Sequence, residues 1–275
     1  MPKQYYYAVK EGVETGVFYS WNECKDKVLG YNGAVYKKFT KKEDAQKFID
    51  GEFDESDLKI TDTEAANLSV GNIELIDYIK KDKSLLNLNN ISKYKDGNYY
   101  IFTDGSRRKD DLNQNKNKTQ YQKKMISGFG IYFGMNQINI SQVYQDKTNN
   151  YCELIAIKYV LEVLDCYKKE IKQIQKEKPN ITFYIVSDSE YCINSIDLWM
   201  DIWQRNGWKT KTNKIVEHQD LFLEIYLYKS KLKLHKINFK LKHVNSHQPP
   251  PLSNDYEMFI WKGNQFADYL ATYTK

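Results

Sequence analysis

The chain has 275 residues, of which 41% are hydrophobic, and carries a formal net charge of +5. This length allows one large domain or two ordinary ones, and the apolar content is enough to build a core. Apolar runs are short and the first residues lack the apolar stretch of a secretory signal, so we expect neither a membrane span nor secretion. The four cysteines form no CxxC pair, which argues against structural zinc and suits a reducing, intracellular compartment.

The first 49 residues have the patterns of a small α+β module. Three segments have the alternation typical of strands: residues 5–9, 17–19 and 34–39. Ser20-Trp21-Asn22-Glu23 and Thr40-Lys41-Lys42-Glu43 have the spacing of capping boxes, and each predicts that a helix follows. We therefore expect a domain over residues 1–49 that contains a three-stranded antiparallel sheet and two helices.

A change of character follows between residues 50 and 97. From Asp50 to Glu64 the sequence has seven acidic residues and one lysine, a composition that favours solvated chain over packed structure. Residues 73–79 contain apolar side chains for one or two helical turns. We interpret residues 50–97 as an acidic, largely flexible linker.

Residues 98–275 show strands followed by helices. Five segments have the composition of strands: residues 99–103, 128–133, 138–144, 182–187 and 239–244. Thr148 is placed to cap a helix that follows it, and a shorter helix is expected near the C-terminus over residues 265–271. These patterns predict an α/β domain with a mixed five-stranded sheet flanked by helices.

Four carboxylates occupy places where a metal-dependent enzyme would need them. Asp104 and Asp188 each follow an apolar strand segment, Glu153 lies early in the predicted helix, and Asp268 lies in the last one. If the two strands are parallel neighbours, Asp104 and Asp188 meet at one edge of the sheet, where α/β proteins bind ligands. Taken singly, each has an ordinary explanation: an Asp after a strand usually forms a turn, and a Glu in a first helical turn complements the dipole. The metal-site hypothesis depends on all four converging.

Several motifs in their order resemble those of type 1 ribonuclease H. In the larger domain they are Thr103-Asp104-Gly105-Ser106, Thr148-Asn149-Asn150-Tyr151-Cys152-Glu153-Leu154, Ser187-Asp188-Ser189-Glu190-Tyr191, Asn206-Gly207-Trp208-Lys209-Thr210 and Gly263-Asn264-Gln265-Phe266-Ala267-Asp268. The first domain resembles the hybrid-binding domain of eukaryotic members through Tyr6-Tyr7-Ala8-Val9, Gly16-Val17-Phe18, Trp21-Asn22-Glu23-Cys24 and Tyr36-Lys37-Lys38-Phe39. The resemblance covers both ends of the chain and leaves out only the linker.

This resemblance implies an endonuclease that hydrolyses the RNA strand of RNA/DNA hybrids and leaves 5′-phosphate and 3′-hydroxyl ends. Asp104, Glu153, Asp188 and Asp268 would hold two Mg²⁺ ions about 4 Å apart, with Mn²⁺ as an alternative. His247 matches the family's histidine that assists proton transfer or product release, and a neutral imidazole suits either task. Protein partners are not indicated, and we expect a monomer.

The resemblance also implies where the hybrid is held. By family position the contacts to RNA 2′-hydroxyls come from Gly105, Ser106, Asn149, Asn150 and Glu153. The contacts to the DNA strand come from Thr148, Trp203, Trp208, Lys209 and Thr210. The small domain would contribute Tyr7, Trp21, Tyr36, Lys37 and Lys38. Two alternatives stay open: the tryptophans could form an ordinary core, and one of the two adjacent strand lysines, which point to opposite faces, could be merely solvated.

Three features depart from the family pattern. Residues Arg107–Lys124 and Gln248–Lys262 are insertions, and Asp146 or Lys147 stands near the place of an arginine that serves the phosphate pocket. Other function classes fit less well. A non-catalytic hybrid-binding protein would not need all four carboxylates, and a reverse transcriptase or integrase would need a polymerase or zinc-binding module, which the sequence lacks.

Overall fold

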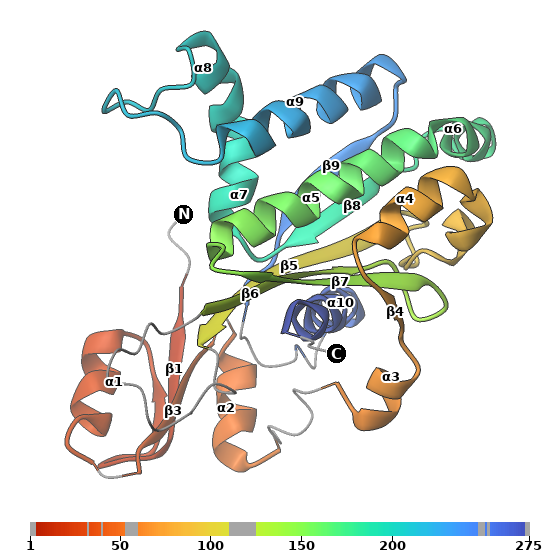
Figure 1. Ribbon diagram of the computed structural model, residues 1–275. Helices are drawn as coiled ribbons and strands as arrows, with labels where there is room; N and C mark the ends of the chain where they lie inside the picture. The colour runs from red at the N-terminus through yellow and green to blue at the C-terminus, as the bar shows by residue number, and fades with distance from the viewer. Residues whose placement is uncertain are drawn as a thin grey trace, which may run out of the picture. The chain divides into compact units, whose positions relative to one another are not determined.

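A computed structural model describes residues 4–31, 33–39, 41–52, 60–109, 125–246, 251 and 254–272 (Figure 1). The chain divides into two compact units. The smaller comprises Met1–Thr61 with Asn245–Trp261, and the larger comprises Asp62–Val244 with Lys262–Lys275.

The smaller unit contains the predicted antiparallel sheet, with strand order β2-β1-β3. Its strands and helices are β1 (Tyr6–Glu11), β2 (Gly16–Phe18), α1 (Trp21–Val28), β3 (Val35–Phe39) and α2 (Lys42–Asp50). Neighbouring residues of β1 point to opposite faces: Val9 packs with Cys24 and Val28 of α1, whereas Ala8 packs with Phe39 and Phe48 on the α2 side. The prediction of three strands and two helices is confirmed.

Two capping boxes were expected to start these helices. Ser20 caps α1 as predicted, because its hydroxyl accepts a hydrogen bond from the Glu23 N–H at 3.3 Å. Thr40 lies outside the described residues, and Lys41 at the start of α2 makes no side-chain cap.

The larger unit is built on a mixed sheet of six strands in the order β4-β7-β6-β5-β8-β9. The strands are β4 (Ser69–Gly71), β5 (Tyr99–Lys109), β6 (Met125–Tyr132), β7 (Ile138–Gln145), β8 (Phe183–Ser187) and β9 (Phe239–His243). The five predicted strands are all present. The sixth, β4, lies in the segment that the sequence analysis assigned to the linker, and its three residues are too few to show a periodic pattern.

Helices cover both faces of this sheet. Figure 1 shows α5 (Asn149–Cys166) along one face and α10 (Asp255–Thr272) along the other, with α9 (Gln219–Leu234) beyond α5. The remaining helical segments on this side are α6 (Lys168–Glu177), α7 (Glu190–Asn194), the π-helical η5 (Ser195–Trp199) and α8 (Met200–Arg205). No helix in the described part of the chain is both long and apolar enough to cross a membrane.

Residues 62–97 belong to the larger unit. They form α3 (Asp62–Ala66), β4, α4 (Glu74–Lys81) and the short 3₁₀ helices η2 (Lys83–Leu85) and η3 (Leu88–Asn90). Five of their side chains are buried in the main core: Ile76, Ile79, Leu86, Leu88 and Ile91. This part of the expected linker is therefore packed structure; its composition resembles a linker because only one face of each short element is apolar.

Charged side chains join α4 to α5. Lys80 forms an ion pair with Glu162, and Glu162 also binds Lys158 at 3.2 Å. Burial alone would lower the pKa of Lys80, but the hydrogen bonds to Glu162 and Asp77 outweigh it and raise that pKa. Lys158 and Glu162 are buried and Lys80 is half-buried, and a charge pair of this kind is costly to break from one side.

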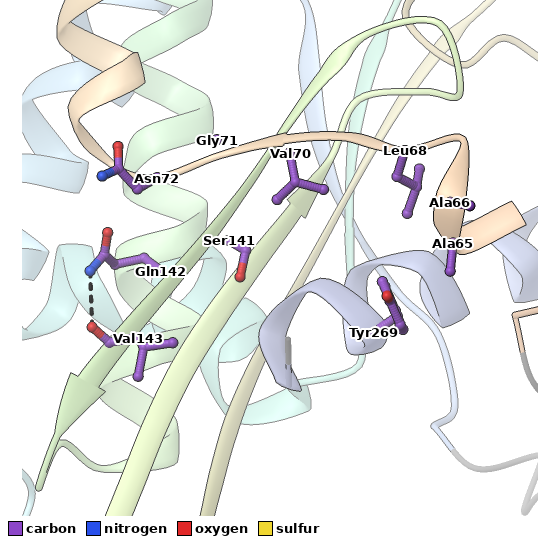
Figure 2. A pocket seen from close by; sticks show the side chains of 10 residues that line it. All are labelled: Ala65, Ala66, Leu68, Val70, Gly71, Asn72, Ser141, Gln142, Val143 and Tyr269. Atoms are coloured by element: carbon purple, nitrogen blue, oxygen red, sulfur yellow. Dashed lines mark hydrogen bonds between the residues drawn. The ribbon is translucent and has the colours of Figure 1, made fainter. Parts of the chain in front are cut away.

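A pocket of about 630 Å³ lies at the β4 edge of the sheet and is lined by residues of α3, β4, β7 and α10. Strand β4 pairs only with Ile138–Ile140 of β7, so it leaves the next part of that edge without a strand. There the Gln142 amide takes the place of a peptide group. Its oxygen accepts from the Ile73 N–H at 3.1 Å. Its nitrogen donates to the Val143 carbonyl at 2.9 Å (Figure 2). This side chain protects the edge from further strand pairing.

The packing of α4 can be tested by truncating one of its buried side chains. We expect Ile79→Ala to lower the free energy of unfolding by about 3 kcal/mol, because it leaves a cavity in the core of the larger unit. Tyr78→Ala, an exposed position of the same helix, should change it by less than about 1 kcal/mol. Urea denaturation measures both. Equal and small effects would show that residues 62–97 do not pack as described.

Candidate metal centre and nucleic-acid interface

Strand register brings Asp104 and Asp188 side by side. Strands β5 and β8 are parallel and pair from Tyr99 with Phe183 to Thr103 with Ser187. Asp104 follows Thr103 in β5, and Asp188 follows Ser187 at the end of β8, so the two aspartates lie side by side. We expected Asp104 to follow the end of a strand. Instead, β5 continues to Lys109, paired with β6, and Asp104 lies within it. Strand β8 does end at this point, because Ser187 is its last residue and Asp188 follows directly.

Glu153 reaches the same place because helix α5 lies very close to β5. A Cβ atom at Gly105 would stand 2.7 Å from the Glu153 nitrogen and 3.1 Å from the Asn149 carbonyl oxygen. Only glycine allows this approach. Thr148 caps the helix by accepting from the Tyr151 N–H at 3.1 Å, as predicted. The Ser187 hydroxyl donates to the Glu153 carboxylate at 3.3 Å and helps to fix it.

Asp268 comes from the opposite face of the sheet. Helix α10 packs directly on two glycines of β6: a Cβ at Gly128 would lie 2.5 Å from the Ala271 carbonyl oxygen, and one at Gly130 would lie 2.6 Å from the Ala271 nitrogen. Gly130 pairs with Asp104 across the β5–β6 ladder. The close contact of α10 with this position therefore places Asp268 beside Asp104.

The last turn of α10 is held by side chains from the sheet. Ser106 and Ser141 donate to the carbonyl oxygens of Ala271 and Leu270 at 2.6 and 2.7 Å, and Arg108 donates to that of Thr272 at 2.5 Å. The last carbonyls of a helix generally lack intrahelical partners, so these three donors stabilise this end of α10. Helix α10 is also longer than the expected helix over 265–271, and it includes Asp255–Lys262 of the predicted insertion.

Three of the four carboxylates form a compact cluster. Oxygen atoms of Asp104, Glu153 and Asp188 all lie within 4.8 Å of one another, and Asp104 also hydrogen-bonds with Asp268. Asp104 is 4% exposed and Glu153 is 2% exposed. Burial and the neighbouring carboxylates raise the pKa of Asp104 well above its usual range. Burial and the charge of Asp188 raise the pKa of Glu153 to about 8.

This chemistry fits a hard divalent cation. The donors are carboxylate oxygens, which Mg²⁺, Mn²⁺ and Ca²⁺ prefer. The raised pKa values show that the cluster is electrostatically unfavourable when its carboxylates are ionised together. A cation in their midst would remove that penalty.

His247 lies outside the described residues, as do Asp110–Lys124 of the first predicted insertion and several residues that follow His247. A different histidine contacts the cluster through the backbone. The His243 Nε2 atom lies 3.1 Å from the Asp188 carbonyl oxygen, at the end of β9. No local sequence pattern points to His243, because its position beside Asp188 follows from the pairing of β8 with β9.

The N-terminus of α5 combines several of the predicted contact residues. Asn149 and Asn150 are exposed there, next to the carboxylates. The Thr148 hydroxyl lies 3.1 Å from the Nε2 atom of His218, whose ring also packs edge-to-face on Tyr151. His218 begins α9 with a left-handed backbone, φ 59°. It is 70 residues away in sequence, and no local pattern pointed to it.

The tryptophan region divides into buried and exposed parts. Trp208 is buried in the main core, which agrees with the alternative that its ring is an ordinary core side chain. Trp203 is half-buried and packs edge-to-face on Phe222 at 5.2 Å between ring centroids. Lys209 is exposed, and the Thr210 hydroxyl accepts from the Lys214 N–H.

The small unit presents an aromatic cluster on one face. The Trp21 ring lies 5.8 Å from the rings of both Tyr7 and Tyr36, and Trp21 and Tyr36 are 41% and 45% exposed. Lys38 pairs directly opposite Tyr7 in the sheet, and its ammonium group lies 3.6 Å from the centre of the Tyr5 ring. Lys37 belongs to the other face, because neighbouring strand residues alternate.

Each of the two units contains a segment that matches a known protein family. Residues 96–274 match the RNase H family, and residues 5–49 match the Ribonuclease H1 N-terminal domain. Ribonuclease H of Schizosaccharomyces pombe is 28% identical over 98% of this chain and 96% of its own length. Ribonuclease H1 of Rattus norvegicus is 27% identical over 80% of this chain and 77% of its own length. The solution structure of the PFV RNase H domain is 21% identical over 63% of this chain and 91% of that domain, with a TM-score of 0.42. The chain therefore belongs to the ribonuclease H family and carries an N-terminal domain of the ribonuclease H1 type.

Proposed function

We propose that this protein is a metal-dependent endonuclease that cuts the RNA strand of RNA/DNA hybrids. The observation that carries the proposal is the convergence of Asp104, Glu153 and Asp188 within 4.8 Å, with Asp268 hydrogen-bonded to Asp104. Membership of the ribonuclease H family supplies the substrate class. The products would be 5′-phosphate and 3′-hydroxyl ends.

The four carboxylates divide the work of holding the metal. Asp104 hydrogen-bonds with both Glu153 and Asp268 and lies within 4.8 Å of Asp188, so it could help to hold both ions of a two-metal site. Two Mg²⁺ ions, or Mn²⁺ in their place, would activate a water and neutralise the charge on the leaving 3′ oxygen. The Gly105 N–H and the Ser187 hydroxyl hold the Glu153 carboxylate in place. His247 keeps its predicted role in proton transfer or product release.

The N-terminus of α5 would position the hybrid. Its free N–H groups and dipole favour an anion, and Thr148 with His218 adds two side chains that can bind a phosphate of the DNA strand. Exposed Asn149 and Asn150 have the amide groups that 2′-hydroxyls require. Gly105 and Ser106 would approach the RNA beside them. Lys209, Thr210 and the exposed part of Trp203 would contact the DNA strand further along.

The small unit would bind hybrid through Tyr7, Trp21 and Tyr36. Exposed aromatic rings can stack on sugars and bases, and Lys38 lies on the same face to meet a phosphate. Lys37 points away and would add only long-range attraction. A second binding site on the same chain raises the local concentration of hybrid at the catalytic unit, which would increase affinity and processivity.

Cleavage of a uniformly labelled RNA/DNA hybrid tests the catalytic proposal. The wild-type protein should cut the RNA strand with Mg²⁺ and not with a chelator. Asp188→Asn should lower the single-turnover rate at least about a hundredfold, or about 2.7 kcal/mol in transition-state stabilisation, because the cluster loses a charged ligand. Glu74→Gln, an exposed acidic position of α4, is the matched control and should keep the wild-type rate. Equal rates for Asp188→Asn and wild type would refute the proposal.

Binding by the small unit can be separated from chemistry with a single substitution. Trp21→Ala should weaken hybrid binding about tenfold, which is the loss of roughly 1.4 kcal/mol of stacking, and leave the single-turnover rate at saturating protein unchanged. Tyr31→Ala removes an equally exposed aromatic of the same unit and should have little effect. Fluorescence anisotropy at two salt concentrations measures the affinity. A lower saturated rate for Trp21→Ala would instead make the module part of the catalytic machinery.

The raised pKa values predict how stability depends on pH. Folded Glu153 keeps its proton up to about pH 8, whereas in the unfolded chain it loses it near the ordinary value of 4.5. The folded state thus binds more protons between these values, and in chelator its stability should fall as pH rises through this window. Mg²⁺ should raise the melting temperature more at pH 8 than at pH 6. Glu153→Gln should flatten the dependence in chelator relative to wild type. An unchanged slope in that variant would contradict the assignment.

A further inference from the structure

Helix α9 is apolar on two opposite faces. One face packs into the main core through Leu221, Phe222, Ile225 and Leu232. On the other, Leu223, Leu227 and Leu234 are 45%, 50% and 77% exposed. A surface helix normally has one apolar stripe and a polar opposite face, and a helix that is apolar all round is normally buried.

The exposed leucines lie in a single line. With Ser230 they follow one another at intervals of four, three and four residues, which is the spacing of the contact positions in a coiled coil. At 100° per residue this seam, Leu223-Leu227-Ser230-Leu234, is centred opposite the buried face of the helix. The pattern is that of a helix that pairs with another helix.

The charges of α9 favour a second copy of the same helix as the partner. Its first half is acidic at Asp220 and Glu224, and its last turn is basic at Lys231 and Lys233, whereas Lys229 pairs with Asp197 of its own chain at 3.1 Å. A second copy of α9 in antiparallel orientation would place the acidic half of each helix beside the basic half of the other. In the register that fits the seam, Leu223 faces Leu234 of the partner subunit and Leu227 faces Ser230 of the partner subunit. Glu224 then lies beside Lys231 of the partner subunit, on the same flank.

In place of the monomer expected from the sequence, we propose that two copies of this protein associate through the α9 seam about a two-fold axis that passes between Leu227 and Ser230. Such an axis makes the same surface serve both subunits, which the opposite charges of the two halves of α9 and the symmetric spacing of the seam allow. Glu224 also has a contact within its own chain, 3.4 Å from Lys158, but its side chain is half-exposed and can reach a second cation.

The expected dimer is weak and reversible. A 16-residue helix is about 24 Å long, and one pair of such helices buries less than the roughly 1,200 Å² of a standard interface. Association should therefore depend on concentration in the micromolar range. It is independent of the carboxylate cluster and does not require the proposed hybrid cleavage.

Sedimentation velocity on the full chain, from about 1 to about 200 µM, tests the proposal. The wild-type protein should shift from monomer to dimer across this range. Leu227→Glu should weaken association at least tenfold, because it places a charge in the middle of the seam. Val13→Glu introduces the same charge at an exposed apolar position of the small unit and should behave as wild type. Circular dichroism and melting temperature establish that each variant is folded.

A charge exchange tests the partner and the orientation. Lys231→Glu alone should weaken the dimer because it faces Glu224, and adding Glu224→Lys should restore it, since both variants keep the apolar seam. A monomer at every wild-type concentration would overturn the proposal, as would a dimer that Leu227→Glu leaves intact. A double variant no stronger than Lys231→Glu would overturn the antiparallel pairing.

Discussion

The repulsion among buried carboxylates is the constraint on which the catalytic unit depends. Burial, and after it the charges of the neighbouring carboxylates, raises the pKa of both Asp104 and Glu153, so Asp104, Glu153 and Asp188 oppose one another's ionisation. No local preference would bring these residues together, because they lie on two strands and a helix that are distant in sequence. The surrounding fold must hold them in place, and a bound cation would convert their repulsion into affinity. The same cluster therefore lowers the stability of the metal-free fold and favours the binding of a cation.

Close backbone approach is how the fold holds them. Gly105 lets α5 approach β5, and Gly128 with Gly130 lets α10 approach β6, so that elements on both faces of the sheet come within reach of Asp104. The parallel register of β5 and β8 sets the remaining carboxylate. A side chain at any of these glycines would collide with the backbone of α5 or α10 and push the layers apart. Glycine therefore acts here through its lack of a side chain, and its backbone freedom is secondary.

The features that were predictable from the sequence are those with a local pattern. The strand alternation, the cap at Thr148 and the carboxylates after apolar runs were all visible, and the order of the motifs indicated the family. Strand β4 and helix α4 were not visible as part of the domain, because short elements with one apolar face resemble a linker in composition. His218 and His243 were missed for a different reason. Their significance comes from contacts with Thr148 and Asp188 that only the tertiary structure creates.

Ser106 shows how the structure refines a family-based expectation. By resemblance it was expected to contact RNA, yet its hydroxyl donates to the Ala271 carbonyl and helps to complete the end of α10. A hydroxyl has one hydrogen, so while this bond is made Ser106 can only accept from a 2′-hydroxyl. Contact with the RNA would then depend on its lone pairs or on the backbone around Gly105. The same hydroxyl also helps to hold the helix that carries Asp268, so removing it would disturb this proposed metal ligand as well as the proposed contact with RNA.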